Sequence, residues 1–367
     1  MTARQTRLDW RVPGLAAVFV AIASLLLAGC SAPLLSSPVL PTVSPAFTAA
    51  AAPASATPDS ASAKHPVTAN TAPGVAALPL MVAVQVSPSA WYVEGLSAAG
   101  SPANQNFISN AGFIISPAGV VVIDALGTPA LAERLVELIR QKTPLPITHV
   151  IVTHYHADHV YGLQVFSKLG ASIWAHRAAN EYLHSDNARL RLIASRSELA
   201  PWVNDETELT PATRWLDGPA ELNLGGLRIL IQPLGPSHTP EDLAVYVPDE
   251  KLLFAGDLVF RNRIPFVGQA NSRRWIAALD ELLALKPGVI VPGHGAVSRQ
   301  GAQDMQLTRD YLVYLRKAMG EAAKNLEPFE QAYALANWER FEQVPMFRFI
   351  NRMNAYNTYL LMEREGD

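Results

Sequence analysis

The chain has a single cysteine among its 367 residues, so no disulfide bond can form within it. Charged residues are also few, at 17% of the total, and the formal net charge is only −3. This balance gives no sign of a nucleic-acid partner. Hydrophobic residues make up 49%, which is enough to build a sizeable core. At this length the chain has room for one large domain or two ordinary ones.

The apolar run near the N-terminus, residues 14–27, is short for a membrane span, which needs about 20 residues. Three arginines precede this run, and Leu27-Ala28-Gly29-Cys30 ends it. The arrangement resembles a bacterial lipoprotein signal, in which Cys30 becomes the lipidated first residue of the mature chain. An uncleaved membrane anchor and an ordinary cleaved signal are the alternatives. Because Ser31 rather than Asp follows the cysteine, the resemblance implies a lipid-anchored protein of the bacterial cell envelope, at the outer membrane facing the periplasm.

Residues 31–77 are rich in Ala, Pro, Ser and Thr and are nearly free of charge. Such a stretch cannot bury enough apolar surface to offset its ordering entropy, so we expect a flexible tether. We therefore divide the chain into a lipoprotein signal at residues 1–30, this tether, a folded domain at residues 78–300 and a helical extension at residues 301–367.

From Leu78 onward, short β-branched runs alternate with helical patterns. Strands are predicted at residues 81–86, 90–93, 107–115, 120–124, 147–152, 172–175, 221–224, 227–232, 243–247, 252–255 and 289–291. Helices are predicted at residues 128–142, 160–169 and 272–285 and over most of the C-terminal part. This order predicts an α/β fold in which two mixed sheets pack face to face with helices outside.

Three of the nine histidines lie in the six residues His154-Tyr155-His156-Ala157-Asp158-His159. The segment follows the predicted buried strand at residues 147–152. Neutral imidazole nitrogen and carboxylate oxygen are ligands that suit zinc, iron and similar ions. His154 and His156 leave an extended segment on the same side, so they can hold one ion together. Asp158 and His159 are adjacent and diverge, so they can reach a second ion.

Three more residues of ligand type, His238, Asp257 and His294, each follow or end an apolar run. Glycines beside Asp257 and His294 allow the backbone to turn sharply there. Taken alone, each residue is more often a turn former or an ordinary surface or core residue. Taken together, they place metal-ligand types at four strand ends of one chain, which indicates a metal site.

The pattern His-x-His-x-Asp-His, a distant His, an Asp after Gly and a late Gly-His-Gly resemble the signature of the metallo-β-lactamase fold superfamily over residues 80–300. The resemblance implies a four-layer αββα sandwich with a C-terminal helical extension and a metal pair at one edge of the two sheets. Carried over by position, it assigns ligands to two ions that share Asp257: His154, His156 and His238 for the first, and Asp158, His159 and His294 for the second.

This nitrogen-and-oxygen ligand set is similar to that of glyoxalase II, whereas β-lactamases of the nearest subclass often have Cys in place of Asp257. The chain also resembles the SoxH-like branch, whose members are associated with sulfur oxidation and with quinoprotein systems. The features that carry this second resemblance are Tyr155, the run Ala175-His176-Arg177 and the helical ending at residues 354–363.

Two ions about 3.5–4 Å apart can share a water and lower its pKa from about 15.7 towards about 7. We therefore expect two Zn²⁺ ions and hydrolysis of a small ester, thioester, lactone or amide. Asp158, Asp257 or the bound water could pass the proton to the leaving group. Some relatives instead hold one Fe²⁺ and oxidise persulfides. A metal-dependent periplasmic binding or maturation factor with little turnover is the third hypothesis.

The substrate of such an enzyme is a small molecule, and three residues are candidates for contacting it. Arg261 and Arg263 follow Asp257 and could hold a carboxylate or sulfonate, although solvated loop arginines are equally common. Tyr155 lies between two predicted ligands and could line the pocket, although a packing role is more usual for such a tyrosine.

Overall fold

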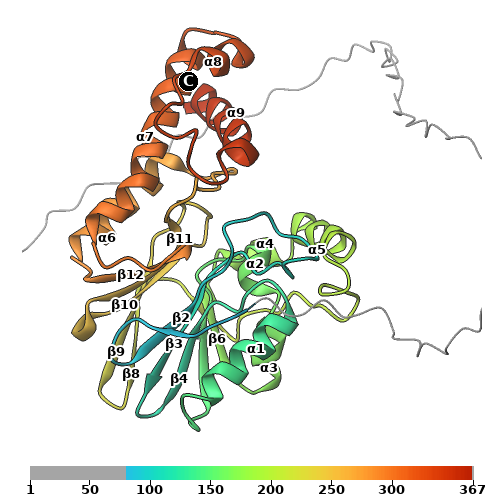
Figure 1. Ribbon diagram of the computed structural model, residues 1–367, viewed down its shortest axis with the longest axis vertical. Helices are drawn as coiled ribbons and strands as arrows, with labels where there is room; N and C mark the ends of the chain where they lie inside the picture. Colours follow the sequence, from blue (N-terminus) through green and yellow to red (C-terminus); the bar gives the residue numbers. More distant parts are fainter. Residues whose placement is uncertain (1–79, 366–367) are drawn as a thin grey trace, which may run out of the picture. The chain divides into compact units, whose positions relative to one another are not determined.

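The computed structural model describes residues 80–365, whose path is drawn in Figure 1. The signal and tether predicted at residues 1–77, with Cys30, lie outside the described residues. Within residues 80–365, no helix combines the length and the apolar character that crossing a membrane requires.

The strands of the described part form two sheets. The first sheet has seven strands in chain order: β1 (Val84–Gln85), β2 (Ala90–Val93), β3 (Ala111–Ser116), β4 (Gly119–Ile123), β5 (Ile147–Ile151), β6 (Ser172–His176) and β7 (Arg214–Leu216). The second sheet has five strands in the spatial order β12 (Val289–His294), β11 (Leu252–Phe260), β10 (Leu243–Val247), β9 (Leu227–Pro233) and β8 (Ala220–Leu224). The pairs from β4 to β7 and the pair β11–β12 are parallel, and the other pairs are antiparallel.

A shared apolar layer joins the two sheets face to face. Val121 of β4 lies in this layer with Val245 of β10 and Phe254 of β11. The alternate residues of β4, Val120 and Val122, belong to a different cluster on the opposite face of the sheet. Since successive side chains of a strand point to opposite faces, β4 is buried on both faces, which explains its uninterrupted apolar sequence.

Helices cover the outer face of the first sheet. Helix α1 (Pro129–Arg140) begins after Thr128, whose side chain accepts a hydrogen bond from the backbone N–H of Leu131. Its buried residues include Leu131, Leu135 and Ile139, which are four positions apart and share one helix face. Together with α3 (Leu163–Lys168), this face packs against the first sheet.

The outer face of the second sheet is covered by α6 (Ser272–Ala284) and α7 (Ala302–Lys324). Asn271 caps α6 by accepting a hydrogen bond from the backbone N–H of Arg274. Trp275, Leu279 and Leu282 form the buried face of α6. The order helix, sheet, sheet, helix is the predicted αββα sandwich, and the prediction of the fold is confirmed.

The C-terminal helices α8 (Phe329–Leu335) and α9 (Phe347–Glu365) continue the core beside α7, and Figure 1 shows α9 running along α7. One buried side chain of α9 reaches out of the helical region. Asn354 Nδ2 donates to the carbonyl of Pro265 at 2.7 Å, and its Oδ1 accepts the N–H of Val267 at 2.9 Å. The helical extension therefore holds the segment 265–267 in place.

The remaining elements are α2 (Ala157–Val160), α4 (Ala179–Leu183), α5 (Asp186–Glu198) and the 3₁₀ turn η1 (Pro248–Glu250). The predicted helix at residues 160–169 is wrong in its bounds, because the chain forms α2 and α3 with a break between them. The strand predicted at residues 107–115 begins only at Ala111. Instead of pairing with β2, Asn110 donates through Nδ2 to the carbonyls of Pro292 and Gly295, both at 2.8 Å.

Candidate metal centre

The first sheet supplies four of the predicted ligands at the end of β5. His154 and His156 lie in the extended segment between β5 and α2, and Asp158 and His159 lie in the short helix α2 itself. The change from extended to helical backbone at His156 sends the two pairs in different directions. This local geometry is the one that the spacing of the motif predicts.

The second sheet supplies the other three predicted ligands. His238 lies in the loop between β9 and β10, Asp257 lies inside β11, and His294 is the last residue of β12. β11 and β12 run parallel, so the carboxyl ends of these two strands meet at the same edge of the sheet. The seven predicted ligands therefore come from both sheets and meet where the two sheets adjoin.

Two glycines, Gly256 and Gly293, allow the backbone of β11 and β12 to pack closely against the residues around the centre. Gly256 has φ of +52°, and a Cβ there would lie 2.7 Å from the Cβ of Thr153. A Cβ on Gly293 would lie 2.0 Å from Oδ1 of Asp257. The register of β11 against β12 also shifts at Gly256, and such a bulge re-aims the side chain that follows it.

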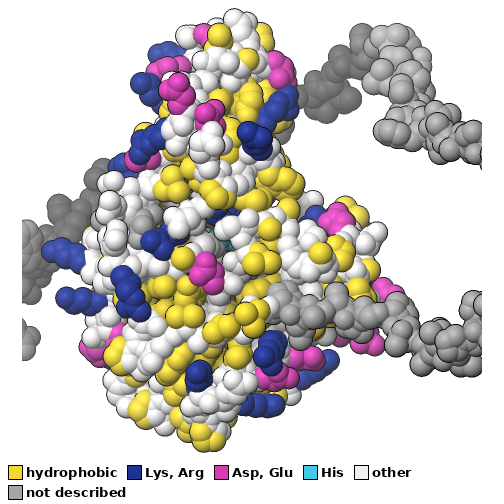
Figure 2. Space-filling model, viewed as in Figure 1, with side chains coloured by type: hydrophobic (Ala, Val, Ile, Leu, Met, Phe, Trp, Pro, Cys, Tyr) yellow, Lys and Arg dark blue, Asp and Glu magenta, His cyan; other side chains and the backbone are white. Residues whose placement is uncertain are grey.

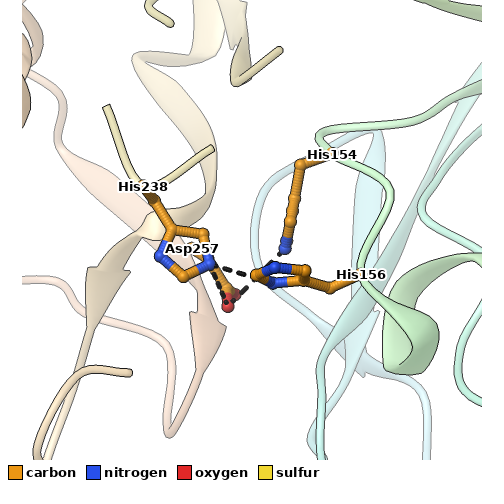
Figure 3. A group of neighbouring side chains, drawn as sticks. All are labelled: His154, His156, His238 and Asp257. Carbon is orange, nitrogen blue, oxygen red and sulfur yellow. Dashed lines mark hydrogen bonds and ion pairs between the residues drawn. The ribbon is translucent and has the colours of Figure 1, made fainter. Parts of the chain in front are cut away.

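The ligand atoms form two groups, and within each group they lie within 4.8 Å of one another. The first group, drawn in Figure 3, consists of His154, His156, His238 and Asp257, and the second consists of Asp158, His159 and His294. Asp257 lies between the groups. Its Oδ2 is 3.3 Å from Nε2 of His238 and 3.3 Å from Nε2 of His294. Its Oδ1 is 3.2 Å from Nε2 of His159.

These spacings fit metal coordination. Two atoms that bind one tetrahedral ion at about 2.0–2.1 Å lie about 3.3 Å apart. In the first group, Nε2 of His238 lies 3.1 Å from Nδ1 of His156, and Nε2 of His154 lies 3.7 Å from Oδ2 of Asp257. In the second group, Oδ2 of Asp158 lies 3.4 Å from Nε2 of His294. The side chains therefore already stand at about the separations that a bound ion would require.

Unpartnered buried atoms support the same conclusion. Among the described residues, Nε2 of His154, Nε2 of His159 and Oδ1 of Asp257 have no hydrogen-bond partner, although each is inaccessible to solvent. Leaving a buried polar atom without a partner costs about 1–3 kcal/mol. Three such atoms aimed into one space are accounted for if each binds an ion.

Hydrogen bonds behind the histidines determine which ring nitrogen faces the centre. The carboxylate of Asp124 accepts from Nδ1 of His159 at 2.9 Å and from the hydroxyl of Thr153 at 2.8 Å. Because that hydroxyl donates to Asp124, it accepts from Nδ1 of His154 at 3.1 Å. Nδ1 of His294 donates to the carbonyl oxygen of Ile108 at 2.6 Å. In all three rings the lone pair of Nε2 is left free for a metal.

Our sequence analysis missed Asp124 and the contacts that Ile108 and Asn110 make. Asp124 did carry a signal, because it directly follows the buried apolar strand β4, which is the neighbour of β5. Asn110 and Ile108 carried none, since their partners near His294 are far away in the sequence.

The protonation states of His154, His156 and Asp257 in the absence of metal suit coordination. Burial lowers the pKa of His156 to about 3 and lowers the pKa of His154 well below its usual range. Burial raises the pKa of Asp257, but the surrounding histidines, His294 and His159 foremost, outweigh burial and hold that pKa well below its usual value. His154 and His156 therefore offer neutral imidazoles, and Asp257 offers a charged carboxylate. For His238 and His159, burial is outweighed by nearby carboxylates, Asp257 foremost, which raise the pKa of both rings, so a metal competes with a proton there.

The three candidate substrate residues lie in different surroundings. Tyr155 is buried, and its hydroxyl donates to the carbonyl oxygen of Thr210 at 3.3 Å. Arg261 donates through Nη1 to the carbonyl of Val297 at 2.9 Å and so holds the loop after β12. Arg263 is also buried, and its Nη1 lies 3.2 Å from Nδ1 of His294, on the side of the ring away from Asp257.

A cavity of about 570 Å³ adjoins the first ligand group. Its lining includes the ligands His156 and His238 as well as Tyr155. Phe266 lines it too, and the ring of Phe266 lies 6.0 Å from that of His156. Neither Arg261 nor Arg263 belongs to the lining.

Comparison with known proteins accounts for this arrangement. The family model described as the metallo-beta-lactamase superfamily matches residues 105–294, which is just over half of the chain. The chain is 24% identical to metallo-beta-lactamase IND-1 of Chryseobacterium indologenes over 195 residues, covering 52% of this chain and 73% of that protein. It is 21% identical to a linear primary-alkylsulfatase of a Pseudomonas species over 238 residues, covering 55% of this chain but only 45% of that protein.

Solved structures share the fold. The sec-alkylsulfatase Pisa1 of a Pseudomonas species aligns with a TM-score of 0.62 at 18% identity, covering 77% of this chain and 50% of that chain. A metallo-beta-lactamase from Pontibacter korlensis aligns with a TM-score of 0.50 at 20% identity, covering 64% of this chain and 99% of that chain.

The chain belongs to the metallo-beta-lactamase superfamily and is a metal-dependent hydrolase of that family. The resemblance on which the ligands were assigned is thereby confirmed at the level of family and fold. The individual roles of the seven ligands stay predictions, and the structure brings all seven together.

Proposed function

We propose that the protein is a dinuclear zinc hydrolase acting on a small ester, thioester, lactone or amide. The observation that carries this proposal is that Asp257 contacts histidines of both ligand groups. A carboxylate shared in this way suits two ions held close together, and the nitrogen-and-oxygen donor set suits zinc. When bound, a zinc pair would supply hydroxide at neutral pH and positive charge next to the developing oxyanion.

The residues of the chain would then hold the ions and handle the proton. Asp257 is surrounded by imidazoles, and its side chain is only 3% exposed. Asp158 faces His159 and His294, and its side chain is 16% exposed. Because a group that delivers a proton to the leaving group must reach the substrate, we assign this transfer to Asp158 rather than to Asp257.

The second ligand group favours two ions over a single iron. A mononuclear site would need only the first group, in which His154, His238 and Asp257 converge. His159 and His294 are nevertheless buried, oriented by hydrogen bonds and aimed at the same carboxylate. Burying two oriented imidazoles with no ion to bind would be costly, which supports a second metal.

Metal analysis tests the proposal. We expect about two zinc ions per chain in protein purified without added metal, together with hydrolysis of at least one ester, thioester, lactone or amide. Asp257→Ala should lose the second ion and the activity. Asp249→Ala, on the exposed turn η1, is the matched control and should change neither. One iron per chain with oxygen uptake would favour the persulfide dioxygenase, and bound metal without turnover would favour a binding factor.

We also propose that the protein is lipid-anchored in the cell envelope through Cys30. The basic start, the short apolar run and the Leu27-Ala28-Gly29-Cys30 sequence support this. Cys30→Ser should move the protein from the membrane fraction to the soluble fraction of its host. Unchanged membrane association of Cys30→Ser would contradict lipid anchoring.

A further inference from the structure

The cavity beside the first ligand group has the dimensions of a small-ligand site. Its volume of about 570 Å³ falls within the range of about 300–1,000 Å³ that such sites usually have. Because His156 and His238 line it, a molecule in this cavity reaches the metal ligands directly. The cavity is therefore the place for the part of a substrate that does not itself react.

The residues that line the cavity, all within the described part of the chain, include acidic side chains but no Lys or Arg. Two of them are carboxylates, Glu181 of α4 and Glu241 in the loop after His238. Glu241 is buried, and its Oε1 accepts the N–H of Tyr155 at 3.2 Å. Glu181 is exposed, so it presents its charge freely to a ligand.

Three aromatic residues, Tyr155, Tyr182 and Phe266, form part of the remaining lining. Phe266 lies beside both ligand histidines, with its ring 6.0 Å from that of His156 and 6.3 Å from that of His238. Tyr182 of α4 faces the same space, and burial raises its pKa to about 12, so that its hydroxyl is neutral at physiological pH. Aromatic faces combined with a carboxylate form the usual environment for an ammonium group, through cation–π attraction and charge pairing.

The outer surface does not share this bias. The face drawn in Figure 2 carries Lys and Arg side chains interspersed with Asp and Glu. A charged ligand therefore meets both signs of charge on this face (Figure 2), whereas the cavity lining, as far as the structure describes it, holds carboxylates and neither Lys nor Arg. Burial raises the pKa of Glu241, so Glu181 is the carboxylate of the lining that presents its charge. A preference for ligand charge that depends on Glu181 would therefore arise in the cavity lining rather than on the face drawn in Figure 2.

We propose that the cavity accepts a substrate arm that is positively charged in preference to one that is negatively charged, with Glu181 as the residue that sets this preference. The proposal rests on the proposed function only in that the reacting group binds at the zinc pair. The substrate class it names is an amine- or ammonium-bearing ester, thioester, lactone or amide.

Binding of small thiols tests the charge preference without turnover. A thiolate binds zinc, so three thiols of similar size place different arms in the cavity: thiocholine, 2-mercaptoethanol and 2-mercaptoethanesulfonate. Dissociation constants are measured by calorimetry on the zinc-loaded protein at low salt. The quantity that matters is the ratio of affinities for thiocholine and mercaptoethanesulfonate. Intrinsic differences between the thiols cancel when this ratio is compared between variants.

We expect Glu181→Lys to lower this ratio about tenfold and Glu181→Gln to lower it less, with both effects shrinking as salt is added. Glu133→Lys is the matched control, because Glu133 is also an exposed helical glutamate and lies outside the cavity. An unchanged ratio in Glu181→Lys, or a change no larger than that in Glu133→Lys, would overturn the proposal. Glu181 is exposed, so both variants should fold.

The same samples separate this proposal from the proposed function. A Glu181-dependent ratio without hydrolysis of any substrate class leaves the charge preference standing and removes the hydrolase. Hydrolysis with a ratio that does not depend on Glu181 supports the hydrolase and removes the charge preference. Protein that binds no zinc and no thiol overturns both.

Discussion

Replacing Asp124 with Asn tests how much the groups behind the histidines contribute to metal binding. One oxygen of Asp124 accepts the backbone N–H of Thr153 at 2.8 Å, and the other accepts the Thr153 hydroxyl at 2.8 Å and Nδ1 of His159 at 2.9 Å. Asp124 has φ of 60°, a left-handed conformation that Asn adopts as readily as Asp. The substitution therefore keeps the backbone and the size of the side chain and changes only the hydrogen bonding.

The expected loss follows from counting donors. Three donors face the carboxylate, whereas an amide offers one acceptor oxygen and an NH₂ group that cannot accept. A hydrogen bond to a charged group contributes about 1.5–3 kcal/mol. Substitution of the group that orients a metal-binding histidine typically costs about 10–100-fold in metal affinity. We expect this loss for the ion held by His159, and a smaller one for the ion held by His154, which Asp124 reaches only through Thr153.

Competition with a chromophoric chelator measures both zinc affinities. Asp217→Asn is the control, because Asp217 pairs with Arg177 on the surface and both side chains are largely exposed. Urea unfolding of the metal-free variants shows how much of the effect is a general loss of stability. If Asp124→Asn binds both ions as tightly as wild type, then Asp124 does not orient His159 and our account of the centre is refuted.

Two further predictions concern residues outside the ligand set. Asn354→Ala leaves the backbone groups of Pro265 and Val267 unpaired, so it should lower the free energy of unfolding by about 2–4 kcal/mol and raise KM more than it lowers kcat. Asn357→Ala, on the same helix, is the control. Equal effects of the two substitutions would contradict this role of Asn354. Burial raises the pKa of Asp242 to about 7, against about 3.9 in an unfolded chain, so its contribution to stability is complete below about pH 4 and is lost as the pH rises to about 7. Metal-free Asp242→Asn should therefore lose less stability than wild type between about pH 5 and pH 8, as urea midpoints will show. Parallel losses in the two proteins would exclude Asp242 as the source.

The metal ligands could be predicted from the sequence because their chemistry and their location are both local properties. β4 and β11 are buried at every position, and β5 is buried at its last two positions, Val150 and Ile151, so apolar residues lead up to the ligands. A histidine or aspartate that ends such a run is conspicuous by contrast. The family resemblance then joined the separate strand ends into one site, and this step did not depend on knowing the sheet order.

The residues that support the site could not be predicted in this way, because their partners are remote in the sequence. Asn110 bonds to carbonyls 182 and 185 positions away, and Asn354 to one 89 positions away. Phe107 and Ile108 are residue types common in strands and lie just before β3, so the pattern predicts a longer strand. The tertiary contacts with the loop around His294 override that local preference.

The centre lies on the boundary between the two sheets, and this position links metal binding to folding. His154, His156, Asp158 and His159 come from the first sheet, and His238, Asp257 and His294 come from the second. Backbone hydrogen bonds of 2.8 Å cross the same boundary, from Leu243 to Thr153 and from Asn110 to Gly293. Ions bound by ligands from both sheets would hold the sheets together, so that binding free energy becomes folding free energy. Substitutions at this boundary should therefore disturb metal content and stability together. Glu181, which lines the cavity but is not a predicted ligand, does not take part in this link, so its substitution can change substrate preference while the metal centre stays intact.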